Sequence, residues 1–112
     1  MRVILCNQGE IARPVEINNE LVEFQSIVGG LIESAPLVNG ALIVCNEEGK
    51  LRDDLLPNRF VTLGGSLNVI YGNFFVCGFD GSDFKSLPHK LEPVVSALLS
   101  KPDFDKKGKR IM

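Results

Sequence analysis

Polar side chains that could bind a ligand are concentrated in the turns of an otherwise apolar chain. Arg59 offers a planar guanidinium that suits a carboxylate or a phosphate, and its neighbour Asn58 can both donate and accept hydrogen bonds. If the segment around Pro57 folds back over the preceding strands, the polar turns would converge. We therefore predict a ligand- or partner-binding site made of Asn46, Glu47, Glu48, Lys50, Asn58, Arg59 and Asp83.

The same side chains also have a purely structural interpretation. Asn and Asp favour turns because they bond to nearby backbone groups, and ion pairs among these residues would hold the loop in place. The residue types alone leave both interpretations open.

Nucleophilic chemistry would need a cysteine beside a base, and the chain has three cysteines and a single histidine. Cys6, Cys45 and Cys77 lie in apolar, strand-like runs, whereas His89 follows a proline near a helix start. No C-x-x-C pair indicates zinc or a redox site. We expect buried thiols, no catalytic residues and no metal or other cofactor, with a cysteine-dependent enzyme as an alternative.

The chain also has acidic pairs and a glycine pair, which could serve acid–base catalysis or phosphate binding. The pairs Glu47-Glu48 and Asp53-Asp54 are adjacent in sequence, so their carboxylates point apart along a strand and form no ready acid–base pair. Gly64-Gly65 leads into a strand, whereas a phosphate-binding loop leads into a helix. A nucleotide- or anion-sequestering homo-oligomer that uses Arg59, Lys50 and this glycine pair is the second alternative.

Length and composition limit the class of protein. The chain has 112 residues, 45% of them hydrophobic and 23% charged, which is typical of one globular domain. The net charge of −2 disfavours nucleic acid as a partner. The sequence has neither an apolar leader nor an apolar run long enough to span a membrane, so we expect a cytoplasmic protein.

The clearest local signal is Asn39-Gly40 between two apolar runs, residues 31–38 and 41–45. Asn-Gly tolerates the positive φ angles of a type I′ turn, so we predict a β-hairpin with such a turn. Residues 41–45 are apolar throughout, which is typical of a central strand.

The rest of the chain predicts further strands and two helices. Residues 2–7, 11–17 and 67–78 read as strands, and Phe60 to Leu63 as a short strand or part of a lid. Asn18 or Asn19 would cap a helix that ends at Gly29-Gly30. A second helix would open at Ser86 and Pro88 and kink at Pro93, or an irregular turn there would lead into a helix that begins near Pro93.

These elements define the expected fold. No regular strand–helix alternation is present, so we predict an α+β domain with a mainly antiparallel sheet and two helices packed on one face. The domain would span residues 1–99, followed by a flexible charged tail at residues 100–112 that carries the basic cluster of residues 106–110.

Several of these segments together resemble a family of small proteins of unknown function from bacteriophages and conjugative elements, mostly of Gram-positive bacteria. The matching segments are residues 28–33, 46–51, 57–59, 71–72 and 81–87. The resemblance implies a small accessory protein of a mobile element, without known catalytic residues or an assigned cofactor. By association, it implies a role directed at the host or at its defences.

Taken together, the sequence predicts a non-enzymatic binding domain. Its partner would be a host protein or a small ligand, contacted through the polar turns, and association into a homo-oligomer is left open by the edge strands.

Overall fold

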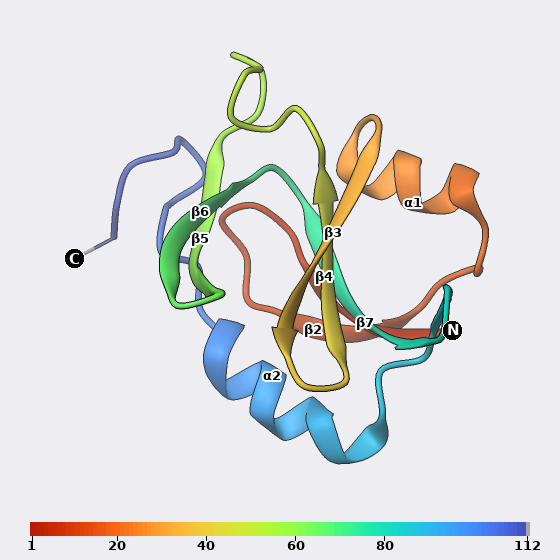
Figure 1. The fold of residues 1–112 in the computed structure, drawn as a ribbon. Coiled ribbons are helices and arrows are strands. Elements are labelled where there is room, and N and C mark those ends of the chain that lie inside the picture. Colours follow the sequence, from red (N-terminus) through yellow and green to blue (C-terminus); the bar gives the residue numbers. More distant parts are fainter. Residues whose placement is uncertain (112) are drawn as a thin grey trace.

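The structure is a computed structural model that describes residues 1–111. Its main feature is an antiparallel sheet. In the described residues this sheet has six strands, in the order β2-β1-β7-β4-β3, with β8 paired to β7 (Figure 1). The strands are β1 (Arg2–Cys6), β2 (Arg13–Glu16), β3 (Ile32–Val38), β4 (Ala41–Asn46), β7 (Phe74–Asp80) and β8 (Asp83–Lys85). A separate antiparallel pair consists of β5 (Pro57–Leu63) and β6 (Ser66–Tyr71).

The central strand β7 is buried on both faces. Phe74 and Val76 point into one apolar cluster, and the alternate residues Phe75 and Cys77 point into another. Because side chains alternate across a strand, a run that is apolar at every position requires cover on both faces of the sheet.

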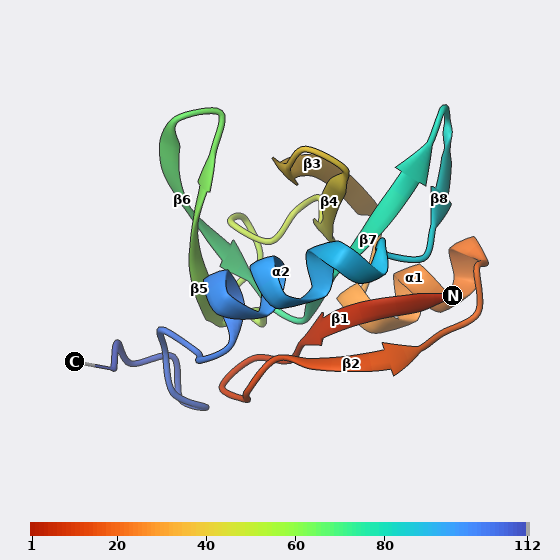
Figure 2. The same cartoon turned by 90° about the horizontal axis from the view of Figure 1, so that it is seen from below.

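The two helices provide part of this cover from opposite sides (Figure 1, Figure 2). Helix α1 (Leu21–Val28) buries Phe24 in the cluster around Phe75. A 3-10 turn η1 (His89–Leu91) leads into helix α2 (Glu92–Leu99), which buries Val95 and Leu99 in the cluster around Val76. The α+β class with an antiparallel sheet is confirmed, but the prediction that both helices pack on one face is wrong.

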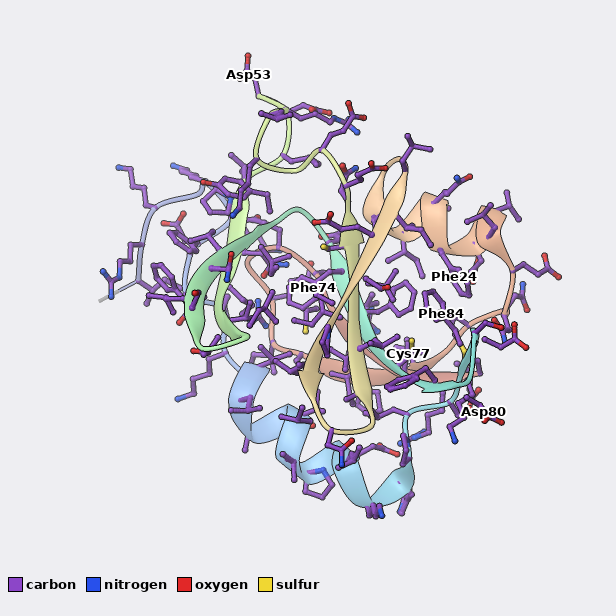
Figure 3. The ribbon with its side chains drawn as sticks, in the orientation of Figure 1. Phe24, Asp53, Phe74, Cys77, Asp80 and Phe84 are labelled. Atoms are coloured by element: carbon purple, nitrogen blue, oxygen red, sulfur yellow. The ribbon has the colours of Figure 1, made fainter. Side chains whose placement is uncertain are left out.

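Aromatic packing fixes α1 on its face. The ring of Phe24 lies 5.4 Å from that of Phe75 and 5.5 Å from that of Phe84, measured between centroids. Figure 3 shows Phe24 and Phe84 beside one another, with Cys77 on the same side. This arrangement joins α1 to both β7 and β8.

The hairpin between β3 and β4 forms at Asn39-Gly40, as predicted, with Val38 opposite Ala41. Its turn type differs from the prediction, because Gly40 has a φ of 93° while no residue other than glycine among the described ones has a positive φ. A type I′ turn needs positive φ at both central positions, so this turn is not type I′.

The ends of the two helices agree in part with those predicted from the sequence. Gly29 ends α1 in the left-handed conformation, with its N–H donating to the carbonyl of Gln25 at 2.8 Å, as predicted. The predicted Asn cap is wrong, since Glu20 occupies the N-cap without a side-chain bond. Pro93 lies in the first turn of α2 and the turn η1 precedes it, so the predicted helix start near Pro93 is confirmed and the alternative of a helix from Pro88 kinked at Pro93 is wrong.

The predicted long strand at residues 67–78 is divided in two. Gly72 adopts a φ of 77°, and the chain passes there from β6 into β7 in the other sheet. The irregular segment before it contains the full strand β5, so the short strand predicted near Phe60 is part of a hairpin. The β5–β6 hairpin forms its own two-stranded sheet, and its residues Val61 and Ile70 pack in the apolar cluster around Val76.

The C-terminal segment also differs from the expected flexible tail. The Phe104 ring lies 5.1 Å from that of Phe60, and Oδ2 of Asp103 accepts a hydrogen bond from the Phe60 N–H at 2.8 Å. Phe104 and Arg110 form an isolated bridge. Residues 100–111 therefore pack along β5 (Figure 1).

Candidate functional site

The predicted site residues do not converge on one place. Asn58 and Arg59 are fully buried, Asp83 lies on the β7–β8 hairpin, and Asn46, Glu47 and Lys50 line a pocket. Glu48 is exposed beside this pocket without lining it. The predicted site is thus divided into three parts.

Asn58 and Arg59 form an internal hydrogen-bond cluster. Nδ2 of Asn58 donates to the carbonyls of Cys6 at 2.9 Å and Gly72 at 2.8 Å. Arg59 donates from Nε to the carbonyl of Leu99 at 2.9 Å and from Nη2 to that of Glu10 at 2.6 Å. These bonds connect β5 to four other segments, so the two side chains serve the fold and are not open to a ligand.

A β-bulge explains how two consecutive residues can both point inward. The register shifts between Pro57 and Arg59 in the β5–β6 ladder, which leaves Asn58 as the extra residue. In a regular strand neighbouring side chains point to opposite faces, whereas a bulge allows both to face one side.

The buried guanidinium has no carboxylate in ion-pair contact among the described residues. Burial lowers the pKa of Arg59, while the nearby Asp103 acts in the opposite direction. The carbonyl of Leu99 lies at the C-terminal end of α2, where the helix dipole favours a positive charge. Carbonyl groups therefore solvate this charge in place of water.

Asp83 is separate from the other residues. It pairs with Asp80 across the β7–β8 turn and is exposed. In Figure 3, Asp80 lies at the other end of the molecule from Asp53, which belongs to the loop that follows Lys50. Asp83 therefore does not take part in the pocket.

Asn46 organises the turn at the mouth of the pocket. Its Oδ1 accepts from the Glu48 N–H at 2.8 Å, and its Nδ2 donates to the carbonyl of Val28 at 3.2 Å. Such a side-chain bond to the backbone two residues on fixes a turn. The side chain is 4% exposed, so its role is to position the loop that carries Glu47 and Lys50.

The pocket lies between the β3–β4 hairpin and β6 and has a volume of about 340 Å³. We call it the β4–β6 pocket. Its size falls in the range of roughly 300–1,000 Å³ that is common for small-ligand sites. It is lined by Glu33, Ala35, Ile43, Cys45, Asn46, Glu47, Gly49, Lys50, Leu51, Leu63, Asn68, Val69, Ile70 and Tyr71.

One wall of the pocket is set by the register of the hairpin. Glu33 pairs with Cys45, and the Glu47 N–H donates to the carbonyl of Leu31 at 2.8 Å, which continues the ladder by two residues. Because side chains two residues apart share a face, Glu33, Cys45 and Glu47 all face the same side.

The opposite wall is β6. A Cβ on Gly49 would lie 3.2 Å from the Cβ of Tyr71, so glycine lets the loop after β4 approach this strand closely. Glu33, Asn68 and Tyr71 line the pocket but are not among the site residues predicted from the sequence. Glu33 could have been predicted, because it is an acidic residue within an apolar strand. The wall formed by β6 could not, because residues 67–78 read as one strand and the sequence does not show that the chain changes sheets at Gly72.

The cysteine in the pocket is a neutral thiol. Burial, together with the nearby Glu33 carboxylate, raises the pKa of Cys45 to about 12, and its Sγ lies 3.9 Å from Oε1 of Glu33. Burial raises the pKa of Cys6 and Cys77 to about 12 as well. The prediction of buried thiols is confirmed.

His89 makes no contact with these thiols in the described part of the chain. Its side chain is 95% exposed, and its Nδ1 lies 3.2 Å from Oε2 of Glu92. A thiol with a raised pKa and a distant imidazole give no activated nucleophile.

Within residues 1–111, no three His, Cys, Asp or Glu side chains are grouped so that they could hold a metal ion. No helix in this range has the length and apolar character needed to cross a membrane.

Comparison with known proteins identifies the family of the chain, and the function of that family is unknown. The model of DUF3846, described as a domain of unknown function, matches residues 1–98. No curated protein and no solved structure matches the chain. Resemblance to a family of unknown function is thus confirmed, while an origin in phages or mobile elements stays a prediction.

Proposed function

Because the chain belongs to the DUF3846 family, a domain of unknown function, we propose from its geometry that it is a non-enzymatic binding domain. Its ligand would be a small molecule held in the β4–β6 pocket. The observation that carries this proposal is the coincidence of a 340 Å³ cavity, an apolar floor and several polar side chains at its mouth.

The polar side chains at this mouth are free to meet a ligand. Glu47 and Lys50 are exposed on the turn after β4, and neither takes part in an ion pair within the described residues. Asn46 fixes the turn that presents them. This is the part of the sequence-predicted site that the proposal retains.

The chemistry around the pocket supports binding over catalysis. The nucleophile nearest the ligand would be Cys45, whose thiol stays protonated at neutral pH because its pKa is raised to about 12. The single histidine is engaged with Glu92 on another part of the surface.

The accessory role implied by the family resemblance forms part of the proposal. A protein that sequesters a small host molecule would modulate its host without catalysing a reaction. The nucleotide-binding alternative is less well supported, because Arg59 is 0% exposed and its guanidinium donates to protein acceptors.

A ligand screen that compares the wild type with a variant whose pocket is filled by a larger side chain tests the proposal. Ala35→Leu would occupy the cavity from β3, and Ser34→Leu would add the same side chain on the opposite face of that strand as a control. A ligand at ten times its Kd stabilises the fold by about 1.4 kcal/mol, which raises the melting temperature by roughly 5 °C.

The expected result is a set of metabolites that stabilise the wild type and Ser34→Leu, but not Ala35→Leu. Hits that persist in Ala35→Leu would place binding elsewhere. The absence of any stabilising compound in a broad screen at millimolar concentrations would count against a small-molecule function.

A further inference from the structure

Two carboxylates of the β4–β6 pocket lie close together on one face of the β3–β4 hairpin. Glu33 is opposite Cys45, and Glu47 is two residues beyond Cys45 in the same ladder. Glu33 and Glu47 are diagonal neighbours, and the backbones of such residues are typically roughly 7 Å apart in an antiparallel pair. Their charges therefore repel each other unless a cation lies between them.

The described residues provide no ion-pair partner for either carboxylate. In the described residues neither Glu33 nor Glu47 is within 4.0 Å of a cationic nitrogen, and the Cys45 thiol donates a hydrogen bond to Oε1 of Glu33 at 3.9 Å. Lys50 also lines the pocket, so its three charged side chains sum to one negative charge. The pocket is electrostatically suited to a cation.

The remaining lining favours an organic cation over a bare ion. Ile43, Leu63 and Ile70 are apolar residues of the lining, which we call its apolar floor, and Tyr71 is an aromatic residue of the same lining. An aromatic face attracts ammonium groups, and an apolar floor releases free energy when it covers hydrocarbon. Among residues 1–111, no group of three acidic, Cys or His side chains is present to coordinate a metal.

We propose that the β4–β6 pocket binds a small organic ammonium ion, with the ammonium group between Glu33 and Glu47 and the hydrocarbon body against Ile43 and Ile70. This inference rests on the proposed function, and it specifies the class of ligand. Lys50 would be the residue that disfavours ligands with a second positive charge.

The chain contains a built-in reporter for the test. Tyr71 is its single tyrosine, and there is no tryptophan, so tyrosine fluorescence reports on the pocket alone. Cyclohexylamine, cyclohexanol and cyclohexanecarboxylate share one ring, do not absorb at the excitation wavelength and differ mainly in charge. Each would be titrated into the 112-residue protein at pH 7.

We expect cyclohexylamine to change the fluorescence with a Kd at least tenfold lower than that of cyclohexanol, and the carboxylate to bind more weakly still. Glu33→Gln and Glu47→Gln should each weaken amine binding about five- to tenfold and leave cyclohexanol unaffected. Glu48→Gln, an exposed neighbour outside the pocket, should have no effect.

The outcomes separate this inference from the proposed function. Equal affinity for the amine and the alcohol would overturn the ammonium preference and leave the pocket as a binding site. Tighter binding of the carboxylate would also overturn it and assign the ligand's charge to Lys50. A response to none of the three compounds would overturn this inference, and the same responses in Ala35→Leu would overturn both.

Discussion

Arg59 donates a hydrogen bond from Nη1 to Oδ1 of Asn58, its neighbour in sequence, in the interior of the protein. Both side chains are 0% exposed, and each makes further bonds to carbonyls of distant segments. The pair joins β5 to the end of β1, to the β6–β7 connection and to the C-terminus of α2. It is therefore a structural element that supports the hairpin forming one wall of the pocket.

Asn58→Ala should destabilise the protein strongly. The substitution leaves the carbonyls of Cys6 and Gly72 without their donor and removes an acceptor from Arg59. We expect a loss of roughly 2–4 kcal/mol in the free energy of unfolding, measured by urea denaturation. Asn68→Ala, whose amide makes one exposed bond to the Ser66 carbonyl, should cost less than about 1 kcal/mol. Equal effects of the two substitutions would argue against a structural role for Asn58.

Arg59→Lys tests the need for a planar, branched donor. A lysine ammonium cannot reach the carbonyls of Leu99 and Glu10 and the amide of Asn58 with one geometry, so at least one acceptor would lose its partner. We expect a loss of roughly 2–3 kcal/mol in unfolding free energy, with Lys50→Arg at the pocket mouth as a near-neutral control. A stable Arg59→Lys protein that had lost ligand binding would instead assign Arg59 to the site.

The buried thiol of Cys6 predicts a loss of stability in alkali. Its pKa is raised from 9.0 to about 12 in the fold, so between these values the unfolded state releases a proton that the native state keeps. The stabilising contribution is complete below pH 9 and is lost as the pH rises toward 12, at about 1.4 kcal/mol per pH unit.

Urea denaturation of the wild type and Cys6→Ala between pH 8 and 11 measures this contribution. The alanine variant should start less stable and lose stability less steeply above pH 9. Parallel curves for the two proteins would show that the thiol ionises equally in the folded and unfolded states.

The packing of the C-terminal segment predicts that Phe104 contributes to stability. Phe104→Ala removes the ring contact with Phe60, and we expect a loss of about 1–3 kcal/mol in unfolding free energy. Lys107→Ala, an exposed position in the same segment, should be neutral. No difference between the two variants would support the flexible tail that the sequence predicts.

Local signals in the sequence predict much of the secondary structure. Asn39-Gly40 marks the hairpin turn, Gly29 ends α1, and Pro93 lies in the first turn of α2, each because of its own backbone preference. The placement of the helices on both faces follows from the strands that are apolar at every position. Residues 41–45 show this pattern, which requires apolar cover on both faces of the sheet.

The candidate site was harder to predict because its walls come from separate parts of the chain. Asn58 and Arg59 follow a proline among polar residues and look like an exposed turn, and only the bulge in β5 turns both inward. Tyr71 reaches the pocket because Gly72 diverts the chain between sheets, a change in direction that the alternation of residues does not encode. Glu47 and Lys50 directly follow a buried strand and line the pocket, and their role in binding stays a prediction.

The most direct test of the binding site is an NMR titration of the uniformly labelled protein with cyclohexylamine. We expect the amide chemical shifts to change in the β4–β6 pocket, at Glu33, Cys45, Glu47 and Tyr71. Those of Asn58 and Arg59 should change little. Largest changes at Asn58 and Arg59, or at the β7–β8 turn around Asp83, would contradict the placement of the ligand site.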